Sequence, residues 1–154
     1  MRSIRVSKGV QGAVLAAYTT GILVATLLLS SGRAARTNLA PFEDLGRLAV
    51  RARRGDLLSE PFLLGVAGIA GNLVLFAPWA FLAWKFLDGA DRSTLRTHVD
   101  VLLFGVLLSV GVEAVQLFLP TRAADVNDVF WNVLGTVVGA LLAHVGRDLK
   151  LEWE

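Results

Sequence analysis

Four long apolar stretches constrain the possible folds of this chain more than any other feature. They lie at about residues 10–29, 61–84, 99–119 and 125–145. Each approaches the roughly 20 residues with which an α-helix crosses a bilayer. Charged residues make up 18% of the chain and gather between the stretches, whereas soluble domains carry about 25%. We therefore predict an all-α, polytopic membrane protein: a single domain, residues 1–154, with four transmembrane helices in an antiparallel bundle.

The first apolar stretch has two interpretations. It follows a basic start that carries Arg2, Arg5 and Lys8, as the core of a cleaved signal peptide does. Signal-peptide cores span about 7–15 residues, however, and this stretch runs from Val10 to Leu29. We favour a retained first helix.

The connection after the first stretch, residues 32–60, holds six arginines. Its amphipathic pattern from Leu45 to Leu58 predicts a short helix lying on the membrane surface. Ser59, just before Glu60 and Pro61, is expected to cap the second membrane helix. Within that helix, the glycines at 65, 68 and 71 predict a smooth strip for packing against another helix.

Composition excludes several kinds of site. The chain has no cysteine, which rules out disulfides, thiolate metal sites and cysteine nucleophiles. Its two histidines, His98 and His144, are not spaced as a metal pair, and we expect both near the membrane interface without a catalytic role. The net charge of +2 comes from basic residues placed between the apolar stretches, as near lipid headgroups. We predict no binding to nucleic acid.

Four spans place both termini on the same side of the membrane. Lysines and arginines number eight on the side of the termini and seven on the other, so the count alone does not fix the orientation. The basic start and the C-terminal Arg147 and Lys150 lead us to place the termini in the cytoplasm.

Polar residues inside the apolar stretches need a reason, because an ionisable group in a membrane helix costs about 2.5–3.5 kcal/mol on insertion scales. Spacings of three and four put those of the third stretch on one helix face, and the same holds for the fourth. These residues are Asn72 in the second stretch, Ser109, Glu113 and Gln116 in the third, and Asp128 and Asn132 in the fourth.

The depth of these polar residues in the bilayer predicts that the polar faces of the third and fourth stretches lie at the same level. Glu113 lies seven residues before Pro120, and Asn132 lies seven residues after Asp125, so both are about 10 Å from the same end of the bundle. We predict that Glu113 and Asn132 face one another across adjacent antiparallel helices, with Asn72 in the same half of the bilayer. Gly135 and Gly139, on the Asn132 face, predict a close approach to another helix.

The polar side chains allow two interpretations. Glu113 and Gln116 line a pocket that binds a headgroup or transfers a proton, or they form a hydrogen-bonded clasp with Asn132 and Asn72. Arg122 either pairs with nearby carboxylates or holds a phosphate in a bidentate manner.

The two aspartates at the start of the last stretch also have competing interpretations. Asp125 is expected to cap the last helix, and Asp128 to favour its positive end. Alternatively, Glu113, Asp125 and Asp128 hold a divalent cation, whose preferred ligands are oxygens. The sequence indicates no other cofactor.

The order of these residues resembles the VanZ-like family of bacterial membrane proteins. Similarity begins with Asn38-Leu39-Ala40-Pro41-Phe42 and the segment Asn72 to Pro78. It continues with Ser109-x3-Glu113-x2-Gln116 and with Pro120-x-Arg122-x2-Asp125-x2-Asp128-x3-Asn132-x2-Gly135-x3-Gly139. The similarity covers about residues 38–142, and Ala80 stands where the family usually has glycine.

The founding member of the family is associated with resistance to the glycopeptide teicoplanin, so the resemblance implies a role in the bacterial cell envelope, in the cytoplasmic membrane. We expect an envelope protein, non-enzymatic or without an assigned mechanism, that binds an anionic lipid or a lipid-linked cell-wall intermediate in an outward-facing polar pocket. Arg122 would hold the phosphate, above Glu113, Gln116 and Asn132. The alternatives are an intramembrane hydrolase or transferase with Glu113 as general base and an Asp-bound cation, and a structural subunit with a sealed pocket.

Overall fold

The computed structural model describes residues 7–28, 37–89, 91–120, 122 and 124–148. Their helices are α1 (Lys8–Leu23), the π-helical turn η1 (Val24–Leu28), α2 (Glu43–Arg53), α3 (Glu60–Leu87), α4 (Thr94–Gln116) and α5 (Val126–Asp148). The segments long and apolar enough to cross a membrane are Lys8–Leu28, Glu60–Leu87, Thr94–Gln116 and Val126–Gly146. The predicted all-α fold with four membrane helices is confirmed.

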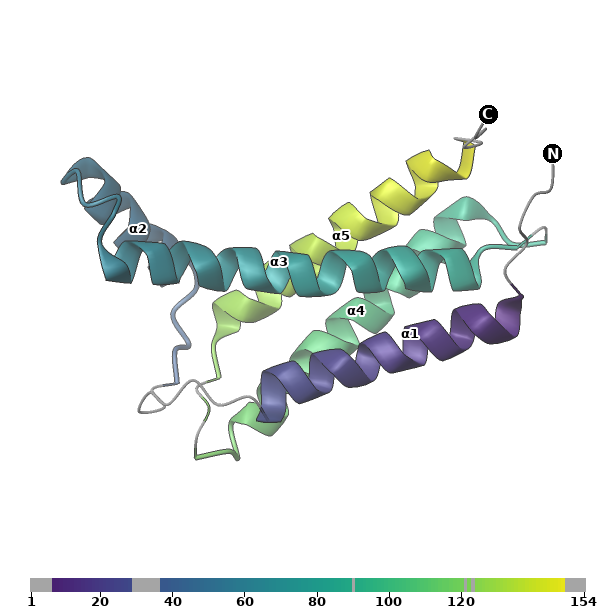
Figure 1. The fold of residues 1–154 in the computed structure, drawn as a ribbon, viewed down its shortest axis with the longest axis horizontal. Helices are drawn as coiled ribbons and strands as arrows, with labels where there is room; N and C mark the ends of the chain where they lie inside the picture. Colours follow the sequence, from purple (N-terminus) through teal and green to yellow (C-terminus); the bar gives the residue numbers. More distant parts are fainter. Residues whose placement is uncertain (1–6, 29–36, 90, 121, 123, 149–154) are drawn as a thin grey trace.

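Helix α3 is the centre of the bundle, since it contacts α1, α2, α4 and α5. Figure 1 shows the four long helices running in alternating directions, with α5 crossing α3 at an angle. One end of the bundle gathers the last turns of α1 and α4 and the first turns of α3 and α5. Because the polar side chains described below lie at this end, we name it the polar end. Helix α2 stands beside it, against the start of α3.

The two glycines of α5 allow it to pack directly on the backbone of α3. A Cβ atom built on Gly135 would lie 2.9 Å from the carbonyl oxygen of Leu73, and one on Gly139 would clash with the carbonyl oxygen of Ala77. Only a residue without a side chain fits at such distances. The predicted close approach of Gly135 and Gly139 to another helix is confirmed, and the partner is α3.

An apolar core fills the bundle mainly away from the polar end. It draws on the second halves of α3 and α5, on the first half of α4 and on the last turn of α1. The buried members are Ile22, Phe76, Trp79, Ala80, Ala83, Trp84, Val101, Ala140 and Ala143. The indole Nε1 of Trp79 donates to Thr19 Oγ1 at 2.9 Å, which adds a polar link between α3 and α1.

The helices extend further at the opposite end than the apolar pattern predicts. α3 continues past Trp84 to Leu87, and α4 begins at Thr94 rather than at Val99. Hydropathy marks only the part of a helix that lies in hydrocarbon, whereas the backbone hydrogen bonds continue beyond it. At the polar end α4 stops at Gln116, because the amides of Phe118 and Leu119 bond to carbonyls three residues back and tighten the turn.

A helix is present within the segment predicted from Leu45 to Leu58, but it begins earlier and is shorter, since α2 spans Glu43–Arg53. The chain turns away two residues after the helix at Gly55, whose φ of 80° is a left-handed conformation that glycine adopts easily. Ser59 does stand at the N-cap position of α3. Its hydroxyl donates to the carbonyl of Asp56 at 2.7 Å, however, and does not cap the helix.

The predicted glycine strip on α3 is wrong for two of its three positions. A Cβ on Gly65 would lie 3.0 Å from Leu48 of α2, whereas nothing in the described chain lies within 4 Å of one on Gly68 or Gly71. The face of α3 that packs on α5 is instead the one carrying Leu73 and Ala77. Spacing alone did not identify which face of α3 is covered.

Lys8 links the start of α1 to the end of α3. Its ammonium group donates to the carbonyl oxygens of Lys85, Phe86 and Asp88 at 3.1, 2.7 and 2.7 Å. These carbonyls lie at the negative end of the α3 dipole, where a cation is stabilising.

We expect Lys8→Met to lower the free energy of unfolding by about 1 kcal/mol, because it removes a charge from the C-terminal end of α3. Unfolding by increasing SDS fraction in mixed micelles measures this change. Arg96→Met, which removes an exposed cation of α4, is the control. Equal stability of the two variants would contradict the capping role.

Candidate functional site at the polar end

The loop before α2 is tied to the start of α5 by backbone hydrogen bonds. The amide of Asn38 donates to the carbonyl of Ala124 at 2.9 Å, and the carbonyl of Asn38 accepts from the amide of Val126 at 3.1 Å. Together they form a parallel bridge between Asn38 and Asp125. This bridge fixes residues 37–42 against the first turn of the last helix.

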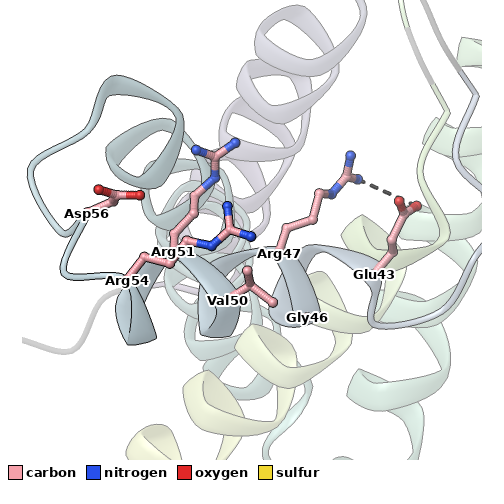
Figure 2. A pocket seen from close by; sticks show the side chains of 7 residues that line it. All are labelled: Glu43, Gly46, Arg47, Val50, Arg51, Arg54 and Asp56. Carbon is pink, nitrogen blue, oxygen red and sulfur yellow. Dashed lines mark ion pairs between the residues drawn. The ribbon is translucent and has the colours of Figure 1, made fainter.

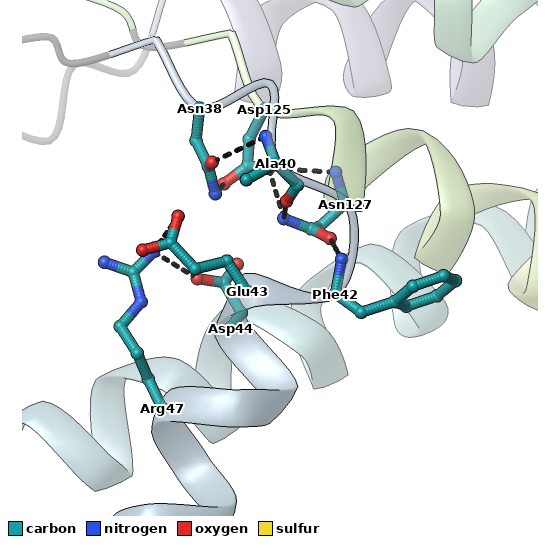
Figure 3. Close-up of polar contacts among 8 residues, drawn as sticks. All are labelled: Asn38, Ala40, Phe42, Glu43, Asp44, Arg47, Asp125 and Asn127. Atoms are coloured by element: carbon teal, nitrogen blue, oxygen red, sulfur yellow. Dashed lines mark hydrogen bonds and ion pairs between the residues drawn. The ribbon is translucent and has the colours of Figure 1, made fainter.

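Asp125 is the centre of the polar end. Its Oδ1 accepts from the amide and from Nδ2 of Asn127, both at 2.8 Å, and its Oδ2 accepts from Nδ2 of Asn38 at 3.1 Å (Figure 3). The bond from the backbone amide of Asn127 caps α5, as predicted. The amide of Asp125 in turn donates to Glu113 Oε2 at 2.8 Å. The loop, α4 and α5 therefore meet at one residue.

Asn127 holds the loop and was not identified from the sequence. It is only 3% exposed, its Oδ1 accepts from the amide of Phe42 at 2.5 Å, and its Nδ2 donates to the carbonyl of Ala40 at 3.3 Å (Figure 3). An asparagine at a helix start gives no signal of such long-range bonds. The signal available was the segment Asn38 to Phe42, which the family resemblance singled out.

Phe42 has an unusual backbone conformation at this point. Its φ of 60° is left-handed, which costs a bulky residue about 1–3 kcal/mol. The bond from Asn127 and an edge-on contact with Phe130, with ring centroids 5.0 Å apart, offset that cost. Phe42 directly precedes α2, so this conformation sets the direction in which α2 leaves the bundle.

Two further polar pairs join the membrane helices below Asp125. Asn72 Nδ2 donates to Asp128 Oδ1 at 2.6 Å, which links α3 to α5. Asn132, 2% exposed, donates from Nδ2 to Ser109 Oγ at 3.0 Å, which links α5 to α4.

The predicted pairing of Glu113 with Asn132 is therefore wrong. The correct face of α4 was identified, but Asn132 meets Ser109, one helical turn deeper than Glu113. Glu113 instead accepts from the amide of Asp125. The backbone amide of Asp125, at the start of α5, has no intrahelical acceptor, so it donates to the nearby carboxylate of Glu113.

Gln116 and Arg122 both donate hydrogen bonds to the end of the first membrane span. Gln116 Nε2 donates to the carbonyl of Thr26, and Arg122 Nη2 donates to the carbonyl of Ala25, each at 2.9 Å. Both carbonyls belong to η1, at the C-terminal end of a helix where donors and cations are favourable. The predicted clasp of Gln116 with Asn132 and Asn72 is thus replaced by a bond to η1.

A groove opens between α4, α5 and the loop at the polar end, with a volume of about 230 Å³. Its lining is apolar apart from two carboxylate residues. It comprises Leu39, Val110, Glu113, Ala114, Leu117, Ala124, Asp125, Val126 and Val129. Of the polar residues predicted to line a pocket, Glu113 and Asp125 do so here, whereas Gln116 and Asn132 are buried among the helices.

The carboxylates predicted as alternative metal ligands do not form one ligand set. In the part of the chain that the structure describes, no three His, Cys, Asp or Glu side chains gather as they do around a metal ion. Glu113, Asp125 and Asp128 each accept a hydrogen bond from a different N–H donor. Those bonds orient the three carboxylates toward separate partners.

The two histidines meet at the opposite end, although their spacing gave no sign of it. The ring centroids of His98 and His144 are 5.2 Å apart, and both rings pack edge-on against Trp84. His98 Nδ1 lies 2.8 Å from the carbonyl of Thr94. This contact joins α3, α4 and α5 far from the groove.

Comparison with protein families supports the resemblance seen in the residues. The model of the VanZ/LLP1 family matches residues 15–147, which includes α2 to α4 in full and every polar-end residue described above. No curated protein and no solved structure matches the chain significantly. The family match and the four membrane-spanning helices together show that the chain is a multi-pass membrane protein that belongs to the VanZ/LLP1 family.

Proposed function

We propose that this protein binds an anionic lipid, or a lipid-linked cell-wall intermediate, at the polar end and acts as a binding protein rather than an enzyme. The observation that carries the proposal is the groove beside Glu113 and Asp125. Its walls are apolar, as an acyl or prenyl chain requires, and its two polar residues accept hydrogen bonds. Hydroxyl or amide groups of a headgroup are suitable donors to them.

Arg122 supplies the positive charge for this ligand. It lies in the connection between Leu117 and Ala124, both of which line the groove. A guanidinium binds phosphate oxygens in a bidentate manner, and its bond to Ala25 fixes where this one sits. The ligand would thus place its phosphate at Arg122 and its chain along the groove.

The proposal includes a location and an orientation. We place the protein in the bacterial cytoplasmic membrane with both termini in the cytoplasm, so that the polar end faces outward, where lipid-linked cell-wall intermediates are used. Binding of such an intermediate would also connect the chain with the glycopeptide resistance for which the founding family member is known. The hydrolase or transferase alternative, with Glu113 as general base, stays a prediction.

We expect Arg122→Ala to lower the enrichment of lipid-linked cell-wall intermediates, relative to zwitterionic phospholipids, around the purified protein about tenfold, since it removes a charge-assisted hydrogen-bond donor. The protein is extracted with its lipids in polymer nanodiscs, and the co-purified lipids are quantified by mass spectrometry. Thermal unfolding of the same samples measures how much of the effect is a loss of stability.

The matched control is Arg96→Ala, which removes an exposed arginine at the opposite end of the bundle. Arg122→Lys should retain part of the enrichment, because it keeps the charge without the bidentate geometry. Lipid enrichment in Arg122→Ala equal to that of the unaltered protein would refute the proposal.

A further inference from the structure

Three arginines lie on one face of α2 and line a second cavity. Arg47, Arg51 and Arg54 are spaced by four and three residues, which aligns them along the helix. The cavity has a volume of about 420 Å³ (Figure 2). The other residues that line it are Glu43, Gly46, Val50 and Asp56. It shares no residue with the groove beside Glu113.

The arginines of this cavity differ in their partners. Arg47 pairs with Asp44 at 2.8 Å and with Glu43 at 3.6 Å. Within the described residues, Arg51 and Arg54 have no carboxylate at ion-pair distance. Figure 2 shows the side chains of Arg51 and Arg54 on the same side of α2, while Arg47 reaches toward Glu43. Two guanidinium groups are therefore available beside one that is neutralised.

Helix α2 packs beside the start of α3, a position that suits the level of the lipid headgroups. Leu48 packs against Gly65, in the second turn of α3. With 28 residues, α3 is about 42 Å long, which exceeds the roughly 30 Å of hydrocarbon in a bilayer. A helix of this length extends beyond the hydrocarbon, and α2 packs beside one of its ends, where a bilayer has its lipid headgroups.

The opposite face of α2 is apolar and suits this position. Leu45, Leu48, Ala49 and Ala52 follow a spacing of three, four and seven residues, which forms one stripe along the helix. A helix with an apolar stripe and an arginine face lies in the plane of the membrane surface, with its arginines toward phosphate groups. Leu45 remains 40% exposed, as expected of a side chain that contacts lipid.

We infer that the α2 cavity binds the headgroup of an anionic phospholipid, with Arg51 and Arg54 on the phosphate and the rim carboxylates on headgroup hydroxyls. Phosphatidylglycerol has this chemistry, since it carries a phosphodiester and an uncharged, hydroxylated alcohol. Glu43 and Asp56 on the rim accept hydroxyl donors and disfavour a second anionic group. The inference goes beyond the proposed function, because it involves neither Arg122 nor the groove.

The test uses the full chain in nanodiscs that contain phosphatidylcholine and 20–30% phosphatidylglycerol. Native mass spectrometry, or a spin-labelled phosphatidylglycerol, reports the preference of the protein for the anionic lipid. We expect that preference to fall about fivefold for each arginine removed in Arg51→Gln and Arg54→Gln, and further in the double variant. An Arg51→Lys/Arg54→Lys variant should keep an intermediate preference, because it retains charge without bidentate contacts.

Arg53→Gln is the matched control. Arg53 lies in the same last turn of α2, where any basic residue stabilises the negative helix end, but it does not line the cavity. A preference unchanged in the double glutamine variant would overturn the inference, as would an equal loss in Arg53→Gln, which would indicate general surface charge. Because Arg122→Ala is assessed on lipid-linked intermediates and the α2 variants on phosphatidylglycerol, the two proposals can fail separately.

Discussion

Replacing Gly139 by alanine should destabilise the bundle more than any other single methyl group added to α5. The new Cβ would clash with the backbone carbonyl of Ala77. Because the clash is with backbone atoms, no change of side-chain conformation can relieve it. The two helices must move apart, and α3 also contacts α1, α2 and α4. We expect a loss of about 3 kcal/mol or more, at the upper end of overpacking effects.

Unfolding of Gly139→Ala by SDS in mixed micelles, followed by circular dichroism, measures the loss. Gly146→Ala is the control, because it adds the same methyl group to the same helix where nothing in the described chain lies within 4 Å. Alanine there should be neutral or mildly stabilising, in line with its higher helix propensity. If Gly139→Ala were as stable as Gly146→Ala, α5 would not pack on α3 as described.

A second large loss is expected from Asp125→Ala. The change removes the cap of α5 and leaves Asn38 and the side chain of Asn127 without their carboxylate acceptor. An N-cap contributes about 0.5–2 kcal/mol, and a buried donor left without a partner costs about 1–3 kcal/mol. We expect the free energy of unfolding to fall by about 2–4 kcal/mol. Hydrogen exchange should show loss of protection at the amides of Asn38 and Phe42.

Asp125→Ser separates the two contributions. Its hydroxyl can cap α5 but is too short to reach the side chain of Asn38 as the carboxylate does. Helix stability should therefore recover, while the backbone amide of Asn38, in a loop that is no longer held by this side chain, stays exchangeable. Asp91→Ala, at an exposed position outside the polar end, controls for loss of a negative charge. Full protection of the Asn38 amide in Asp125→Ala would contradict the role assigned to this carboxylate.

Local patterns were sufficient for the membrane helices and for part of the polar end. Apolar stretches predicted the four spans, helical spacing identified the polar face of α4, and Asp125 was recognised as a cap. Gly135 and Gly139 were correctly expected at a close contact. Each of these inferences depends on neighbours within a few turns of one helix, which a sequence displays directly.

The partners of the polar residues depend on contacts between distant segments and were mostly missed. Gln116 and Arg122 bond to carbonyls of η1 that lie 90 and 97 residues earlier in the chain. Asn127 bonds to a loop 85 residues before it. A shift of one helical turn is enough to exchange Glu113 for Ser109 as the partner of Asn132. Depth counted from predicted helix ends is not accurate to one turn, because those ends are themselves uncertain by one or two residues.

The bridge between Asn38 and Asp125 also has a consequence for biosynthesis. The two residues are 87 positions apart. At about 5–20 residues per second, the ribosome therefore needs roughly 4 to 17 seconds to synthesise the chain from Asn38 to Asp125. During that interval α2 has already been synthesised, but Asp125, with which Asn38 forms the bridge before α2, has not. The contacts that hold the loop before α2 can therefore form only after the start of α5 has been synthesised. A chain truncated before residue 125 would expose this segment, and membrane proteases that remove incomplete proteins would meet it first there.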